Sequence, residues 1–111
     1  MQLFIVVLTE EHYVPTLLKN FYELNYHGSV LSTKSIHHAF MDSIEPEPYF
    51  GGISKMIESE VEISRPMILV VVKEDEEVKK LSKAVNDTLD GIKGKGFMYS
   101  LPIGYLEGLD N

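Results

Sequence analysis

Cysteine is absent from this chain of 111 residues, and basic residues are scarce, with 10 lysines and arginines against 17 acidic residues. Without cysteine the chain forms no disulfide, holds no metal through thiolates and runs no redox chemistry through sulfur. The net charge of −7 opposes bulk attraction to phosphate backbones and to anionic membranes. We therefore predict no nucleic-acid partner.

Long hydrophobic runs are missing as well. The apolar stretch at residues 3–8 is too short to cross a bilayer. It has no basic leader and no small-residue cleavage site, and acidic Glu10 and Glu11 follow it directly. We interpret the stretch as a buried strand and expect a cytoplasmic protein with no membrane insertion.

Two unbroken apolar runs, residues 3–8 and 67–72, each precede acidic residues and then a helical pattern. Such runs are typical of central strands, and the acidic residues suit the positive end of a following helix. The helical spacing is carried by Val14, Leu17, Leu18, Phe21 and Leu24 in the first case, and by Val78, Leu81, Val85 and Leu89 in the second. The first helix should begin near His12 and end before Gly28, and Gly91 should close the second.

Each predicted helix leads into a further strand, at residues 28–36 and 97–101, and Pro102 ends the latter or places it at an edge. The order is strand, helix, strand, a long connection, then strand, helix, strand. This order predicts an α+β fold of the ferredoxin-like βαββαβ type, with a four-stranded antiparallel sheet and two helices on one face. The length accommodates one such domain, residues 1–111.

The connection between the second and third strands, at about residues 37–65, is long for so small a domain. It contains Glu45-Pro46-Glu47-Pro48, then Gly51-Gly52, then a short candidate helix at residues 53–57. Connections of this length are usually functional or disordered. We expect a mobile loop whose second half is partly ordered.

The sheet face opposite the two helices poses a separate problem. The central strands are apolar on both sides, whereas the helices cover one side only. An uncovered apolar face needs a partner, so the sequence predicts self-association.

The closing segment combines Gly94-Lys95-Gly96, an apolar strand and Leu101-Pro102-Ile103, and the loop contains Tyr49-Phe50-Gly51-Gly52-Ile53-Ser54-Lys55-Met56. Together with the element order and the long loop, these segments resemble a divergent branch of the PII-like signal proteins, the nitrogen regulatory protein PII superfamily. The resemblance implies a homotrimer with small-molecule pockets in the clefts between subunits. It also implies adenine nucleotides as ligands and a long loop that engages a partner protein.

Carried over by position, the ligand-binding segments are the loop base and the turn before the last strand, namely Lys34, Ser35, Ile36, His37, His38, Lys93, Gly94, Lys95 and Gly96. Glycines let backbone N–H groups approach an anion, and nearby lysines add positive charge. Typical members have glycines, an arginine and a glutamine at the loop base, where this chain has residues 36–40. The ligand therefore stays open between an adenine nucleotide and another small anion.

Both segments have other readings. Residues 93–96 lack the spacing of a Walker A loop and also suit a turn that enters an edge strand. His37 and His38, with Asp42, offer metal ligands, which gives the alternative of a divalent-cation-tolerance-type trimer. On a regular strand, however, adjacent histidines point to opposite faces.

The chain shows no pattern that indicates catalysis. It has no cysteine and no G-x-S-x-G elbow, and its serines and histidines come without an orienting acid that the sequence places. The acidic residues 74–77 favour a helix N-terminus over a cation site. We therefore predict a sensor for a small-molecule effector, and no enzyme.

Overall fold

The computed structural model describes residues 1–44 and 65–109, apart from the side chain of Asp42. The Glu45–Pro48 run, the Tyr49–Met56 segment and the helix expected at residues 53–57 therefore lie outside the described residues.

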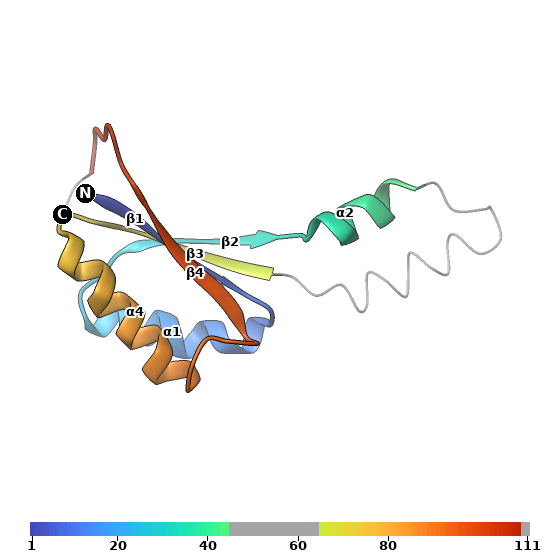
Figure 1. Ribbon diagram of the computed structural model, residues 1–111, viewed down its shortest axis with the longest axis horizontal. Helices are drawn as coiled ribbons and strands as arrows, with labels where there is room; N and C mark the ends of the chain where they lie inside the picture. Colours follow the sequence, from blue (N-terminus) through green and yellow to red (C-terminus); the bar gives the residue numbers. More distant parts are fainter. Residues whose placement is uncertain (45–64, 110–111) are drawn as a thin grey trace.

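Figure 1 shows the described elements and their order along the chain. They are β1 (Gln2–Leu8), the 3-10 helix η1 (Glu11–Tyr13), α1 (Val14–Glu23), β2 (Gly28–Thr33), α2 (Ile36–Ser43), β3 (Arg65–Val72), α4 (Asp75–Leu89) and β4 (Gly96–Pro102). The four described strands form one antiparallel sheet in the order β2-β3-β1-β4. Each strand-helix-strand unit thus has a strand of the other unit between its own two strands. The predicted ferredoxin-like α+β fold is confirmed.

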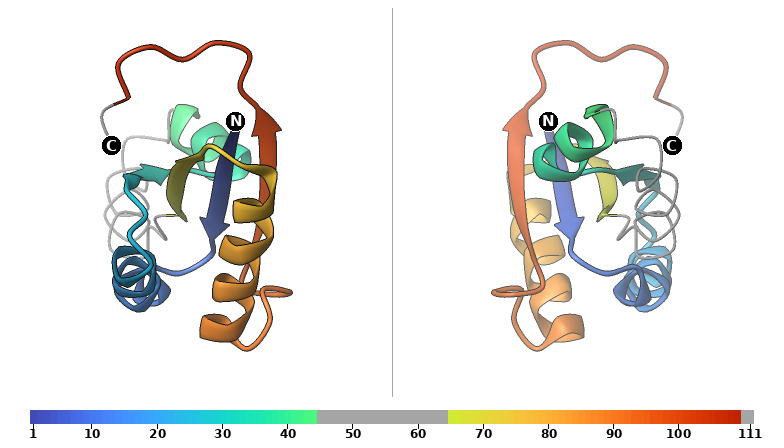
Figure 2. Two further views of the ribbon diagram at one scale, coloured as in Figure 1. Left: turned by 90° about the vertical axis from the view of Figure 1, so that its left-hand side faces the viewer. Right: turned by 90° about the vertical axis from the view of Figure 1, so that its right-hand side faces the viewer.

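Helices α1 and α4 lie side by side on one face of the sheet (Figure 2), as the sequence predicts. Alternate residues of β1 and β3 point toward them because successive side chains of a strand face opposite sides. The core of buried side chains consists of Phe4, Val6, Leu8, Ile68, Val70 and Val72 from the strands and Leu17, Phe21, Leu81, Val85 and Leu89 from the helices.

The opposite face of the sheet carries the remaining apolar side chains and is covered by no helix in the described part of the chain. The strand register places Leu3, Ile5, Val7, Leu31, Met67, Leu69, Val71, Phe97, Tyr99 and Leu101 on this open face. Leu31, Phe97 and Leu101 are each about half exposed, at 49%, 53% and 48%. The uncovered apolar face that the sequence predicts is therefore present.

The ends of the two long helices follow from local chemistry. Pro15 lies in the first turn of α1, where its missing N–H costs no intrahelical bond. At the start of α4 a capping box joins Glu74 and Glu77, so the acidic residues there complement a helix N-terminus as predicted. At the end of α4 two residues with positive φ follow the last turn, Asp90 with φ of 56° and Gly91 with φ of 91°.

The second strand is shorter than predicted, which changes the loop base. β2 ends at Thr33, and α2 begins at Ile36 instead of the strand continuing to that residue. The Ser35 hydroxyl accepts a hydrogen bond from the backbone N–H of His38 at 3.1 Å and so caps α2. The first part of the expected loop is thus a helix that projects beyond the sheet (Figure 1).

Candidate functional site

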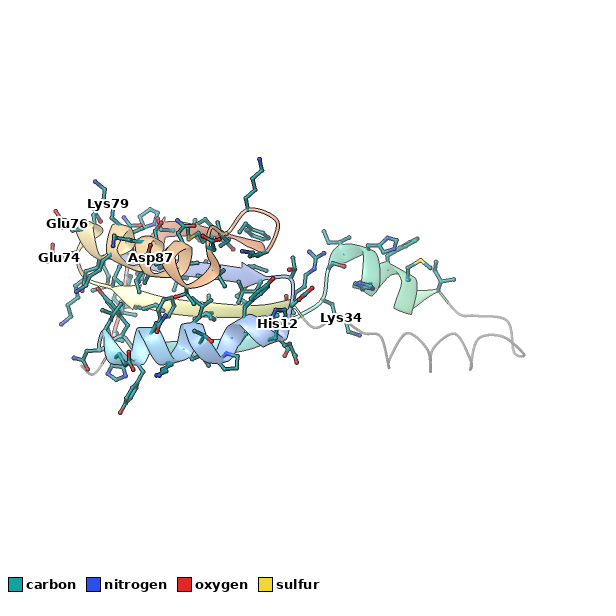
Figure 3. All side chains as sticks on the ribbon, turned by 90° about the horizontal axis from the view of Figure 1, so that it is seen from below. His12, Lys34, Glu74, Glu76, Lys79 and Asp87 are labelled. Atoms are coloured by element: carbon teal, nitrogen blue, oxygen red, sulfur yellow. The ribbon has the colours of Figure 1, made fainter. Side chains whose placement is uncertain are left out.

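One end of the sheet gathers the segments that the sequence singled out. There β1 and β2 end and β3 and β4 begin, because Thr33 pairs with Arg65 and Leu8 pairs with Gly96. Figure 3 shows Lys34 near this end and Glu74 and Glu76 of the acidic helix start at the other.

The turn before β4 is shaped by two glycines. Gly94 has φ of 84°, a conformation that side chains rarely adopt, and Gly96 has φ of 153°. A Cβ atom on Gly96 would lie 2.1 Å from the carbonyl oxygen of Val7. The carbonyl of Lys95 accepts hydrogen bonds from the backbone N–H of Thr9 at 2.9 Å and from its hydroxyl at 3.1 Å. Gly96 is thus needed for close contact with β1.

The two lysines of this turn have different positions. The Nζ atom of Lys95 donates to the carbonyl oxygen of Leu89, the last residue of α4, and so satisfies the helix C-terminus. Lys93 is exposed and makes no hydrogen bond or ion pair with any described residue. Lys93 is therefore the one of the pair whose charge is available to a ligand.

A cavity of about 200 Å³ lies at this end of the sheet. Its lining residues are Val7, Leu8, Thr9, Arg65, Gly94, Gly96 and Phe97. The structure thus brings two predicted residues, Gly94 and Gly96, together with a cation that the sequence reasoning missed. Arg65 is half-buried, and its guanidinium forms no ion pair within the described residues. It is the only arginine in the chain and stands directly before a buried strand, which is the signal that could have identified it.

The loop base lies outside this cavity in the single chain. In the sheet order, β3 and β1 separate the end of β2 from the start of β4. Lys34 and Ser35 connect β2 to α2, and Ile36 on α2 is 89% exposed. The expectation of a strand to residue 36 and a loop from residue 37 is wrong, because the cap at Ser35 starts a helix there.

The histidines give little support to a metal site. The rings of His37 and His38 meet edge to face with centroids 5.9 Å apart on adjacent positions of α2. No group of three histidine, aspartate or glutamate side chains that could hold a metal occurs among the residues described here. The third ligand of the sequence hypothesis, the side chain of Asp42, lies outside the described part.

Comparisons with known proteins extend the description of the fold. No family model matches this chain, and no curated protein matches it. The crystal structure of a functionally unknown protein from Pediococcus pentosaceus ATCC 25745 is similar, with a TM-score of 0.61 and 12% sequence identity. The match covers 97% of this chain and 96% of that chain. At this identity the likeness shows the fold alone.

None of the helices in the described part of the chain has both the length and the apolar character that a membrane span requires.

Proposed function

We propose that this protein is a PII-like sensor. It assembles into a homotrimer, binds a small anionic ligand at the sheet end that carries Arg65, Gly94 and Gly96, and regulates a partner protein through the connection between β2 and β3. The observation that supports this most directly is the cavity that those three residues share. In this proposal the protein is a sensor and not an enzyme.

The chemistry of the cavity suits an anion. An arginine guanidinium presents several N–H donors in a planar fork that matches a carboxylate or a phosphate. Gly94 leaves the backbone of the turn open to approach, because a Cβ atom there would meet no atom within 4 Å. Exposed Lys93 in the same turn adds positive charge to an otherwise acidic protein.

The volume limits what one chain binds alone. Pockets for drug-sized ligands usually measure about 300–1,000 Å³, whereas this cavity measures about 200 Å³. One chain therefore has room for an anionic group and little more. An adenine nucleotide would need a second surface, and the loop base of a neighbouring subunit, residues 34–38, is the candidate for it.

A short covalent and hydrogen-bonded path connects the cavity to α2. The Thr33 hydroxyl donates to the backbone carbonyl of Arg65 at 2.7 Å. Two residues later Ser35 caps α2. A ligand that draws the Arg65 side chain into the cavity therefore acts on the pair of strands β2 and β3, from which α2 projects. This path supports a regulatory role for the connection between β2 and β3.

The open face supports the assembly. Its apolar side chains lie on all four strands, and those of Leu31, Phe97, Tyr99 and Leu101 are exposed in the single chain. Burial of apolar surface is the main driving force of association, at roughly 25 cal/mol per Å² removed from water. In the PII-like arrangement, such a homotrimer has small-molecule pockets in the clefts between its subunits.

Thermal-shift and calorimetric titrations test the proposal, with phosphate, bicarbonate, adenine nucleotides and cyclic dinucleotides as probes. A bound anion should raise the midpoint of unfolding. Arg65→Gln should weaken its binding by about tenfold or more, the range for a lost charged hydrogen bond. The control Lys79→Gln removes an exposed positive charge from α4 and should leave binding unchanged. Equal binding by both variants would contradict the proposal.

A further inference from the structure

A second cavity, of about 520 Å³, lies near the other end of the sheet. Four separate parts of the chain line it: β1 at Leu3, the turn between α1 and β2, the end of β3 with the start of α4, and the C-terminal segment through Leu109. Its volume falls within the usual range for small-molecule sites. No residue of the first cavity takes part in it.

One part of the cavity wall is aliphatic. Leu3 and Val71 pair across β1 and β3, Leu69 lies two residues along the same face, and Leu109 approaches from the C-terminal segment. Aliphatic walls favour an aliphatic group on the ligand because both surfaces lose contact with water.

Two opposite charges also line the cavity, those of Lys73 and Glu77. Glu77 is held in place: its Oε2 atom accepts the backbone N–H groups of Lys73 and Glu74, each at 3.0 Å. Its Oε1 atom accepts only the Tyr26 hydroxyl within the described residues, at 3.5 Å, and so has room for another donor. The Lys73 ammonium forms no ion pair with any described residue.

Tyr26 keeps this arrangement fixed over the physiological range. Its burial, together with the nearby negative charge of Glu77, raises the pKa of Tyr26 above its ordinary value. The hydroxyl therefore stays protonated and continues to donate to Glu77.

We propose that this cavity binds an apolar α-amino acid. The ammonium group of the ligand pairs with Oε1 of Glu77, the carboxylate pairs with Nζ of Lys73, and the aliphatic side chain packs against Leu3, Leu69 and Val71. A ligand with a single charge would leave one of the two protein charges unmatched, and an uncharged ligand would leave both. A zwitterion with an aliphatic side chain matches both charges and the aliphatic part of the wall.

Isothermal titration with three matched probes tests this inference on the full chain. L-leucine carries both charges, 4-methylpentanoate lacks the ammonium, and 3-methylbutylamine lacks the carboxylate. The wild type should bind leucine at least tenfold more tightly than either analogue. Lys73→Gln should remove the preference for leucine over the amine, because the variant no longer pairs with a carboxylate. Lys79 is an exposed lysine on α4 outside the cavity lining, so Lys79→Gln should keep the preference for leucine over the amine.

Two results would overturn the inference. One is the absence of saturable leucine binding by the folded wild type. The other is an equal preference for leucine in Lys73→Gln and Lys79→Gln. Because the two cavities share no residue, Arg65→Gln should bind leucine like the wild type. Failure of the anion site and failure of this site are therefore distinguishable.

Discussion

Single residues at the turn before β4 have different tasks although they are neighbours in the sequence. Gly96 permits close contact between β4 and β1, and Lys95 satisfies the end of α4. Gly94 has open space around its Cα atom, and Lys93 is exposed. Of the four residues in this turn, Gly94 and Lys93 are therefore available to a ligand in the first cavity, whereas Gly96 and Lys95 contact other parts of the chain.

The two glycines should respond differently to the same substitution. Gly96→Ala places a methyl group against the Val7 carbonyl and should destabilise the fold by more than about 3 kcal/mol, the upper part of the range for single substitutions. Gly94→Ala meets no atom within 4 Å and should cost only the backbone strain of a left-handed residue, roughly 1–2 kcal/mol. Urea unfolding of both variants measures the difference, and equal losses would contradict this account.

The titration of the Tyr26 hydroxyl should make the free energy of unfolding depend on pH in the alkaline range. Because its pKa is raised in the folded state, mainly by burial, the unfolded chain loses this proton first as pH rises. The stabilising contribution is therefore complete below about pH 10, the pKa of a tyrosine in an unfolded chain, and is lost as pH rises through the folded-state pKa. Tyr26→Phe should lose less stability between pH 9 and pH 11 than the wild type.

The control for this titration is Tyr22→Phe, which removes the hydroxyl of a side chain that is 75% exposed. Thermal unfolding across the same pH range should show that this variant loses as much stability with rising pH as the wild type. If Tyr26→Phe also loses as much stability as the wild type, the Tyr26 hydroxyl does not contribute to the pH dependence.

At the level of elements, α2 differs from α1 and α4. The long helices place five side chains in the core, whereas α2 places none there and carries exposed Ile36, Phe40 and Met41. Most helical stability in proteins comes from packing on such a core, and short isolated helices are marginal in water. The hydrogen bond at Ser35 is therefore a large part of what holds α2 together.

Removal of this cap should loosen α2 alone. Ser35→Ala should cost about 1 kcal/mol locally, the usual value of an N-cap, and should speed amide exchange at Ala39 and Phe40 about fivefold. Exchange in α4 should not change. Ser32→Ala in β2, whose hydroxyl makes no hydrogen bond in the described part of the chain, is the matched control. Unchanged protection of α2 in Ser35→Ala would contradict the prediction.

At the level of the whole molecule, the two faces of the sheet have different roles: one packs against the helices, and the other is the proposed contact between chains. Val6 and Val70 are 0% and 2% exposed and face the helices, so a charge at either position would test the core of one chain. Leu31 lies on the open face and is 49% exposed, so a charge there tests the contact between chains.

Leu31→Glu should convert the proposed trimer into a folded monomer, because the interface would have to bury a charge without a partner. Light scattering measures the mass, and circular dichroism confirms the fold. Tyr22→Glu places the same charge on the outer surface of α1 and should leave the mass of the assembly unchanged. A wild-type protein that is monomeric at all concentrations would contradict the proposed trimer.

The sequence predicted the fold more fully than the site. Apolar runs and helical spacing depend on residues close in the chain, so the central strands, the helices on one face and the acidic start of α4 were predicted correctly. The helix at Ile36 was missed because its apolar residues face solvent and give no core periodicity. Arg65 was missed because it meets Gly94 and Gly96 only when β3 and β4 begin at the same end of the sheet.

The sequence by itself therefore determined the order of the four strands and the two long helices, the fold class and an uncovered apolar face, because alternation and helical spacing are local properties of the chain. Only the tertiary structure decided which lysine caps a helix, which arginine joins the glycine turn, and that Lys73 and Glu77 line a common cavity with Leu109. These juxtapositions arise from strand register and helix packing, which bring together residues far apart in the chain.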